Sequence, residues 1–131
     1  MYGFIRVVLI VMLSSFSLFA GDFLAKEALK AQKEKKLLLV TVSSDRCPYC
    51  IKMRKDVFEN TSYKSKIAQK YIHVEVMHND IALPEALHAK YLPTNYILSP
   101  KDLKVLDEFA GYIEPKHFLE LLEEVYQQEV K

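Results

Sequence analysis

The stretch LLLVTVSSDRCPYC, residues 37–50, combines a strand-like run with two cysteines three positions apart. Its first part, Leu37 to Val42, is continuously apolar or β-branched, which is typical of a strand buried on both faces. Pro48 suits the first turn of a helix, because the N–H that proline lacks has no helical partner there. The pattern predicts a buried strand, a loop, and a helix from Pro48 to about Glu59 that begins at Cys47.

Helix and strand patterns alternate over the rest of the chain. Residues 22–35 form an amphipathic helical pattern that Asp22 can cap. Further along, the patterns predict a helix over 61–71, a strand over 71–77, a loop over 78–82, a helix over 84–91, strands over 94–98 and 104–110, and a helix over 115–128. Turn residues at 99–102 join the last two strands as a hairpin. This order predicts an α/β sandwich, a mixed central sheet flanked by helices.

The first twenty residues differ from the rest. Arg6 precedes a run from Val7 to Phe19 that is almost purely apolar, and small residues close it. The run is shorter than the roughly 20 residues that span a bilayer. We therefore expect residues 1–20 to be a signal peptide cleaved after Ala20 and residues 21–131 to be one exported domain. A retained membrane anchor is the alternative.

Composition narrows the class of partner. The chain has 131 residues, half of them hydrophobic, with 18 Lys and Arg against 17 Asp and Glu. This size fits one domain with its own core. A nearly neutral chain has no strong field to attract polyanions. We expect a monomer without a nucleic-acid partner.

Cys47 and Cys50 are the only cysteines in the chain. A disulfide between them closes too short a loop to hold a fold together, so the pair is predicted to be chemical rather than structural. The free N–H groups at a helix start stabilise negative charge, and Arg46, Lys52 and Arg54 can add to this effect. Cys47 is therefore the candidate nucleophile and Cys50 the candidate resolving thiol.

Metal binding is the main competing interpretation of the two cysteines. A single Cys-x-x-Cys supplies only two of the four ligands of a structural zinc site, and no histidine pair at metal spacing accompanies it. Haem attachment is excluded because Ile51, not histidine, follows Cys50. The histidines are scattered and are expected to be surface or packing residues: His73, His78, His88 and His117. We expect no bound metal, and no cofactor besides the dithiol itself.

Three features together resemble the thioredoxin family. The Cys-Pro-Tyr-Cys motif falls between the first central strand and its helix, Leu92-Pro93-Thr94 opens the hairpin, and Gly111 ends it. Over residues 22–131 the chain is similar to thioredoxin-fold proteins, and its exported setting resembles periplasmic thioredoxin-like proteins, including the SoxW-type group. The motif itself is familiar from glutaredoxins. The resemblance implies a thioredoxin-like three-layer sandwich with thiol–disulfide oxidoreductase activity.

The same resemblance implies a substrate site. The Leu92–Pro93 bond would be cis and lie beside the reactive thiol, with Leu92 offering backbone hydrogen bonds to an extended substrate. Pro48, Tyr49, Leu92 and Tyr112 would line a mostly apolar groove for a flexible polypeptide. The implied partners are protein thiols and disulfides, with a membrane thiol-electron transporter as donor. Net reduction is favoured, because the chain resembles neither the oxidants with an inserted helical domain nor the dimeric isomerases.

Two positions depart from thioredoxin. Six residues before the first cysteine, Thr41 replaces a buried aspartate that assists proton transfer to the deeper thiol, and Arg46 replaces a tryptophan. Glu75, in the middle of a predicted central strand, is a candidate substitute, because a buried acid can exchange a proton near neutral pH. An exposed strand glutamate is the alternative. A metal-binding or client-binding module without redox turnover also remains open as a function.

Overall fold

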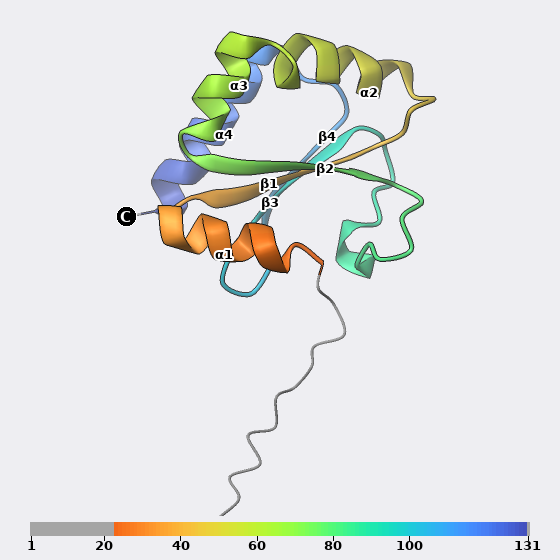
Figure 1. Cartoon of the computed structure of the whole chain (residues 1–131). Coiled ribbons are helices and arrows are strands. Elements are labelled where there is room, and N and C mark those ends of the chain that lie inside the picture. Colours follow the sequence, from red (N-terminus) through yellow and green to blue (C-terminus); the bar gives the residue numbers. More distant parts are fainter. Residues whose placement is uncertain (1–22, 131) are drawn as a thin grey trace, which may run out of the picture.

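The computed structural model describes residues 23–130, so the predicted signal segment lies outside the described residues (Figure 1). Asp22, predicted to cap the first helix, also lies outside them, and the N-cap of that helix is Leu24. The described part contains, in order, α1 (Ala25–Glu34), β1 (Leu37–Ser43), α2 (Pro48–Met53), the π-helical turn η1 (Arg54–Phe58), α3 (Thr61–Ala68), β2 (Tyr71–Met77), the 3₁₀ turn η2 (Glu85–Leu87), β3 (Thr94–Leu98), β4 (Val105–Ala110) and α4 (Pro115–Glu129). No helix among these residues is long and apolar enough to cross a membrane.

The strands of residues 23–130 form one mixed sheet in the order β2-β1-β3-β4. β1 pairs with β2 in parallel and with β3 antiparallel, and β3 and β4 form the predicted hairpin. All seven residues of β1 are buried, as the continuous apolar run predicts for a central strand. The mixed sheet expected from the sequence is confirmed, and the cysteine motif follows directly from its central strand.

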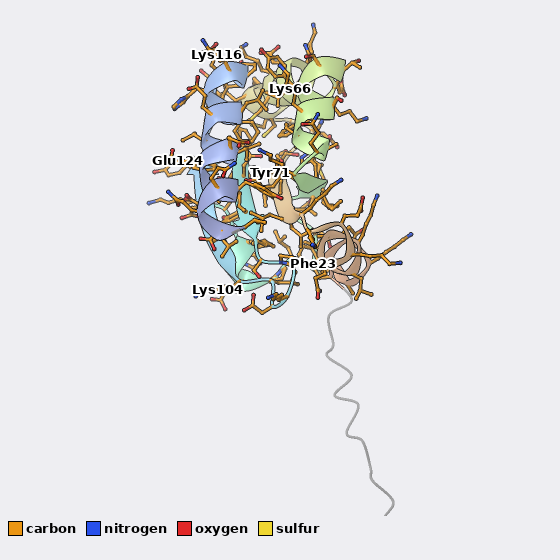
Figure 2. All side chains as sticks on the ribbon, turned by 90° about the vertical axis from the view of Figure 1, so that its left-hand side faces the viewer. Phe23, Lys66, Tyr71, Lys104, Lys116 and Glu124 are labelled. Atoms are coloured by element: carbon orange, nitrogen blue, oxygen red, sulfur yellow. The ribbon has the colours of Figure 1, made fainter. Side chains whose placement is uncertain are left out.

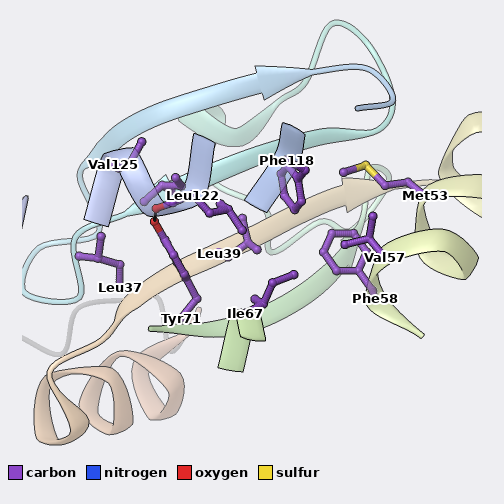
Figure 3. Packing of buried hydrophobic residues seen from close by; sticks show 11 residues of the cluster. Leu37, Leu39, Met53, Val57, Phe58, Ile67, Tyr71, Phe118, Leu122 and Val125 are labelled. Carbon is purple, nitrogen blue, oxygen red and sulfur yellow. Dashed lines mark hydrogen bonds between the residues drawn. The ribbon is translucent and has the colours of Figure 1, made fainter. Parts of the chain in front are cut away.

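Helices cover both faces of the sheet, which gives the expected three layers (Figure 1). Because side chains alternate along a strand, Leu37 and Leu39 of β1 pack toward α2, α3 and α4, whereas Leu38 and Val40 pack toward α1. Figure 3 shows the first of these cores, in which Phe118 of α4 lies close to the π-helical turn. The core therefore fixes the helix of the cysteine pair against the sheet.

The outer sides of the helices are charged. Figure 2 shows Lys66 of α3 and Lys116 and Glu124 of α4 pointing away from the sheet, and all three are exposed. This distribution is that of amphipathic helices packed on one side only.

Two predicted elements differ in the structure. The helix predicted over 84–91 is only the single turn η2, because the chain becomes extended at His88, with a φ of −75° and a ψ of 90°. The helix after Cys47 runs as predicted to Phe58, but from Arg54 it widens into a π-helical turn. Such turns are often found at functional sites.

Gly111 ends the hairpin in a conformation that suits glycine, with a φ of 86°. Its N–H donates to the carbonyl oxygen of Pro93 at 2.7 Å. The end of β4 is thereby tied to the loop that precedes β3, which places both beside the cysteine motif.

Candidate active site

The two cysteines occupy different environments at the start of α2. Cys47 is the N-cap residue and is partly exposed, whereas Cys50 is only 2% exposed. Both are free thiols, and the N–H of Cys50 donates to the Sγ atom of Cys47 at 3.2 Å. Pro48 occupies the first helical turn, as predicted. A substrate can therefore reach Cys47 and not Cys50, and the hydrogen bond stabilises negative charge on the accessible sulfur.

Burial controls the deeper thiol. Loss of hydration on burial, together with the hydrogen bond and charge of Cys47, raises the pKa of Cys50 to about 12, while the Ser44 backbone and the charge of Arg54 act in the opposite direction. At neutral pH Cys50 therefore keeps its proton. The raising effects of Cys47 belong to its free thiol or thiolate, so they end once Cys47 is bonded to another sulfur.

The loop before β3 lies against the accessible sulfur. The Leu92–Pro93 peptide bond is cis, and Sγ of Cys47 donates to the carbonyl oxygen of Leu92 at 3.5 Å. Pro93 is fully buried, and the Thr94 hydroxyl donates to the carbonyl oxygen of Tyr91 at 2.6 Å. These contacts hold the loop in one shape beside Cys47.

The start of α2 and the loop before β3 each carry an exposed aromatic side chain. Tyr49 on α2 is 62% exposed and Tyr91 on the loop is 60% exposed, with Pro48 also exposed and Leu92 half-buried. Three residues predicted for the groove, Pro48, Tyr49 and Leu92, thus lie next to Cys47 in the chain or in space. Tyr91 was not predicted, although its place directly before Leu92 was a usable signal.

The hydroxyl of Tyr112, the fourth predicted groove residue, points toward Asp56. That hydroxyl donates to the Oδ2 atom of Asp56 at 2.7 Å, and the Nζ atom of Lys52 lies 2.7 Å from the same oxygen. The Lys52 ammonium also sits 4.5 Å from the centre of the Tyr112 ring. Tyr112 therefore fastens the segment after Gly111 to the outer side of α2 and η1, and the charge of Lys52 is engaged there.

A chain of polar side chains crosses the sheet on the α2 side. Nε2 of His73 lies 2.8 Å from Oγ1 of Thr41, the Thr41 hydroxyl donates to Oδ1 of Asn95 at 2.6 Å, and Nδ2 of Asn95 lies 3.5 Å from Sδ of Met53. The His73 ring stacks on Phe58, with centroids 4.0 Å apart. Burial, with a smaller effect of the Lys64 charge, lowers the pKa of His73 to about 4. The sequence marked Thr41 as a departure but did not reveal its partners.

The central-strand position predicted for Glu75 is wrong. β2 is an edge strand, not a central one, and Glu75 is half-buried in an ion pair with Arg54. The guanidinium Nη2 lies 2.6 Å from Oε1, and Nε contacts both carboxylate oxygens at 3.0 and 3.1 Å. The carboxylate is therefore held by a cation rather than lying uncompensated in the interior.

The side chains that commonly bind metals are spread out in the described part of the chain. Within residues 23–130, no three or more His, Cys, Asp and Glu side chains gather closely enough to hold an ion.

The fold and the site together define a class: a thioredoxin-like α/β domain with a Cys-x-x-Cys pair at the start of the helix after its central strand. Residues 24–126 match the family model of the thioredoxin-like domain, and the chain belongs to this family. A comparison with curated proteins finds no match.

Solved structures share the fold at low sequence identity. A thioredoxin from Thermus thermophilus is 24% identical with a TM-score of 0.60, and the match covers 76% of this chain and 82% of that one. The periplasmic thioredoxin SoxS from Paracoccus pantotrophus is 16% identical with a TM-score of 0.57, covering 71% and 98%. The DsbD C-terminal domain from Neisseria meningitidis is 15% identical with a TM-score of 0.60, covering 76% and 90%.

Proposed function

We propose that this protein is an exported thiol–disulfide oxidoreductase that reduces protein disulfides through a mixed disulfide at Cys47, which Cys50 resolves. The observation that carries the proposal is the unequal exposure of two thiols in hydrogen-bond contact. Cys47 is accessible and accepts the Cys50 N–H at 3.2 Å, while Cys50 is buried. Exchange needs one thiol that meets the substrate and a second that is reserved for the intermediate.

The proposed reaction has two displacement steps. The Cys47 thiolate attacks one sulfur of the substrate disulfide, forming a Cys47–substrate bond while the substrate S–S bond breaks and its other sulfur leaves as a thiolate. Cys50 then loses its proton and attacks Cys47, and the second substrate sulfur leaves as the Cys47–Cys50 disulfide forms. The substrate gains two electrons, the dithiol is oxidised, and no further cofactor takes part.

A flexible polypeptide is the proposed substrate. Leu92 lies beside Cys47, and the segments that carry these two residues also carry the exposed rings of Tyr49 and Tyr91, which provide apolar surface. Aromatic side chains that are already exposed gain most from being covered by a partner segment. Substrates with a reachable disulfide in an extended segment fit this arrangement.

Export and an electron donor complete the proposal. The apolar run before residue 21 supports export to the bacterial periplasm, where a neighbour in fold, SoxS, is named as a periplasmic thioredoxin. The oxidised pair must be reduced again for turnover, and we propose a membrane thiol-electron transporter as the donor. The domain would act as a monomer.

Trapping tests the proposal directly. Cys50→Ser should accumulate mixed disulfides through Cys47 in the periplasm, and the reduced wild-type protein should reduce insulin. Cys47→Ser, the matched control, should trap nothing. If both cysteines can be replaced by serine without loss of biological activity, the redox function is wrong. Stoichiometric copper or zinc binding without exchange would support the metal-binding alternative instead.

A further inference from the structure

A closed series of contacts joins the cysteine helix to the loop that carries Leu92. It begins at Cys47, the N-cap of α2, whose Sγ atom donates to the carbonyl oxygen of Leu92 at 3.5 Å. The next residue, Pro93, accepts the N–H of Gly111 on its own carbonyl oxygen at 2.7 Å. Gly111 leads directly into Tyr112. The loop before β3 is therefore held by the nucleophile on one side and by the segment after β4 on the other.

Tyr112 closes this series on the cysteine helix. The segment from β4 to α4 passes beside α2 (Figure 1), and the Tyr112 hydroxyl donates to Oδ2 of Asp56, in η1, at 2.7 Å. Nζ of Lys52 donates to the same carboxylate oxygen at 2.7 Å and to the Tyr112 hydroxyl oxygen at 3.3 Å. Lys52 lies on the helix that Cys47 caps, so the series begins and ends on α2. We call Tyr112, Asp56 and Lys52 the Tyr112 cluster.

The Tyr112 cluster has more contacts than an isolated surface ion pair. A single exposed pair contributes little, because solvent screens it and two long side chains lose freedom. Here one carboxylate accepts hydrogen bonds from a hydroxyl and an ammonium, and the ammonium also lies 4.5 Å from the centre of the Tyr112 ring. The hydrogen bond from Lys52, and next that from Tyr112, lower the pKa of Asp56. At neutral pH the carboxylate is therefore ionised and accepts both hydrogens.

The two ends of the series respond differently to the reaction. In the described part of the chain, the polar side-chain contacts that join α2 and η1 to the loop before β3 and the segment after β4 are the Cys47–Leu92 bond and the Tyr112 cluster. A Cys47 sulfur that is ionised or bonded to a substrate has no hydrogen to donate to Leu92. The Tyr112 cluster takes no part in the exchange and keeps its contacts.

We propose that Tyr112 is a positioning residue: together with Asp56 and Lys52, it keeps Leu92 beside Cys47 while a polypeptide substrate is bound. This inference rests on the proposed function. Before the attack, the thiol of Cys47 gives its proton to water, and its hydrogen bond to Leu92 is lost. The carbonyl oxygen of Leu92 can then accept an N–H of an extended substrate segment, at a position that the Tyr112 cluster maintains.

Insulin and a small disulfide separate positioning from thiol chemistry. Tyr112→Phe removes the hydroxyl and keeps the ring beside Lys52. It should raise KM for insulin about two- to fivefold, with dithiothreitol as the electron donor, because the loop must then be ordered by the substrate itself. The value of kcat should change less than about twofold. Nitrothiolate release from 5,5′-dithiobis(2-nitrobenzoate), which needs Cys47 but no extended segment, should also stay within about twofold.

Amide hydrogen exchange measures the attachment of the loop. The Gly111 N–H donates to Pro93, and its exchange, followed by NMR, should be about two- to tenfold faster in Tyr112→Phe than in the wild-type protein. Tyr126→Phe is the matched control, because it also removes a tyrosine hydroxyl that donates to an oxygen, the carbonyl of Lys35 at 3.1 Å. Lys35 precedes β1, whereas Cys47 follows it. The control should keep the wild-type KM and exchange rate.

Variants of Asp56 test the same hydrogen bond from its other side. Asp56→Ala should raise KM for insulin as Tyr112→Phe does. Asp56→Asn should lie closer to the wild-type protein, because its amide oxygen can still accept the hydroxyl hydrogen. The double variant Tyr112→Phe/Asp56→Ala should be no worse than the more affected single variant, since both remove one interaction. Circular dichroism spectra establish that all variants fold.

The outcomes separate the two proposals. A folded Tyr112→Phe variant with the wild-type KM for insulin overturns the positioning role and leaves the oxidoreductase intact. A raised KM with unchanged Gly111 exchange also overturns it, because the loop would then be held without Tyr112. Equal losses on insulin and on the small disulfide overturn it as well, since the variant would have changed Cys47 itself. If the wild-type protein reduces neither disulfide, the proposed function fails.

Discussion

The Nε2 atom of His73 lies 2.8 Å from the Oγ1 atom of Thr41. The Thr41 hydroxyl has one hydrogen and gives it to Asn95, so Nε2 of His73 must be the donor in this contact. The neutral ring with its hydrogen on Nε2 therefore suits the network, and a second proton would have to be taken up at Nδ1 inside a largely buried site. The position that carries an acid in thioredoxin is here part of an uncharged chain.

The lowered pKa of His73 predicts a loss of stability in acid. The pKa of His73 is about 4 when folded, against an ordinary value of 6.5, so the unfolded chain binds more protons between these values. Stability should fall as the pH drops from 6.5 to 4, by about 3 kcal/mol at most from this residue. The free energy of unfolding, measured in urea between pH 4 and 7, should change less with pH in His73→Gln than in the wild-type protein. His117→Gln, at an exposed position, should keep the wild-type slope. Equal slopes in all three proteins would contradict the assignment.

Removing the Thr41 hydroxyl should destabilise the fold. Thr41→Val keeps the shape but leaves the Nε2 hydrogen of His73 and Oδ1 of Asn95 without this partner. Unpaired polar atoms in the interior cost about 1–3 kcal/mol, and we expect a loss in that range by urea unfolding at pH 7. Ser65→Ala, on the exposed side of α3, is the control and should change little. A Thr41→Val protein as stable as wild type would show that the network contributes nothing.

The Arg54–Glu75 ion pair should show energetic coupling. Both side chains are about one quarter exposed and the contact is bidentate, which favours a real interaction over a surface pair. A double-mutant cycle with Arg54→Gln and Glu75→Gln should give a coupling energy of about 1–2 kcal/mol. The more exposed pair Lys70–Glu123 is the comparison and should couple more weakly. If the losses of stability in Arg54→Gln and Glu75→Gln are additive in the double variant, the two side chains do not interact as the structure shows.

The two thiols should differ strongly in alkylation. Burial raises the pKa of Cys50 to about 12, so at pH 8 only about 1 in 10,000 of these thiols is ionised. One equivalent of iodoacetamide should modify Cys47 at least about tenfold faster than Cys50, as read by peptide mass spectrometry. In concentrated guanidinium the two rates should converge. Preferential modification of Cys50 in the folded protein would reverse the assigned roles.

The exposed tyrosines should matter for proteins and not for small disulfides. Tyr49→Ala and Tyr91→Ala each remove an exposed ring near Cys47, and we expect each to lower kcat/KM for insulin about fivefold, which corresponds to about 1 kcal/mol. The rate at which Cys47 attacks the small disulfide 5,5′-dithiobis(2-nitrobenzoate), measured by nitrothiolate release, should stay within about twofold. Leu29→Ala removes an equally exposed apolar side chain from α1 and should affect neither assay. Equal losses on large and small disulfides would argue against a polypeptide groove.

The sequence by itself determined the strands and helices, the placement of the cysteine motif and the family. The buried run of β1, the alternation of β2, the hairpin turn and the apolar spacing of α4 are local patterns, and the structure contains each of these elements close to its predicted bounds. They can be recognised because hydrophobic periodicity and turn chemistry depend on neighbouring residues only. The same holds for Pro48 at the start of α2.

Tertiary structure alone decided the partners of the polar side chains. Glu75 was a candidate buried acid in a predicted central strand, with an exposed glutamate as the alternative, yet the sheet order puts it on an edge strand beside Arg54, 21 positions away in the chain. Thr41 and His73 are 32 positions apart, and Thr41 and Asn95 are 54 apart. Such contacts follow from how strands are ordered and which face each residue takes, and local spacing carries no information about them. The cysteine motif could therefore be predicted from the sequence, whereas the charges and hydrogen bonds that surround it could be identified only in the folded structure.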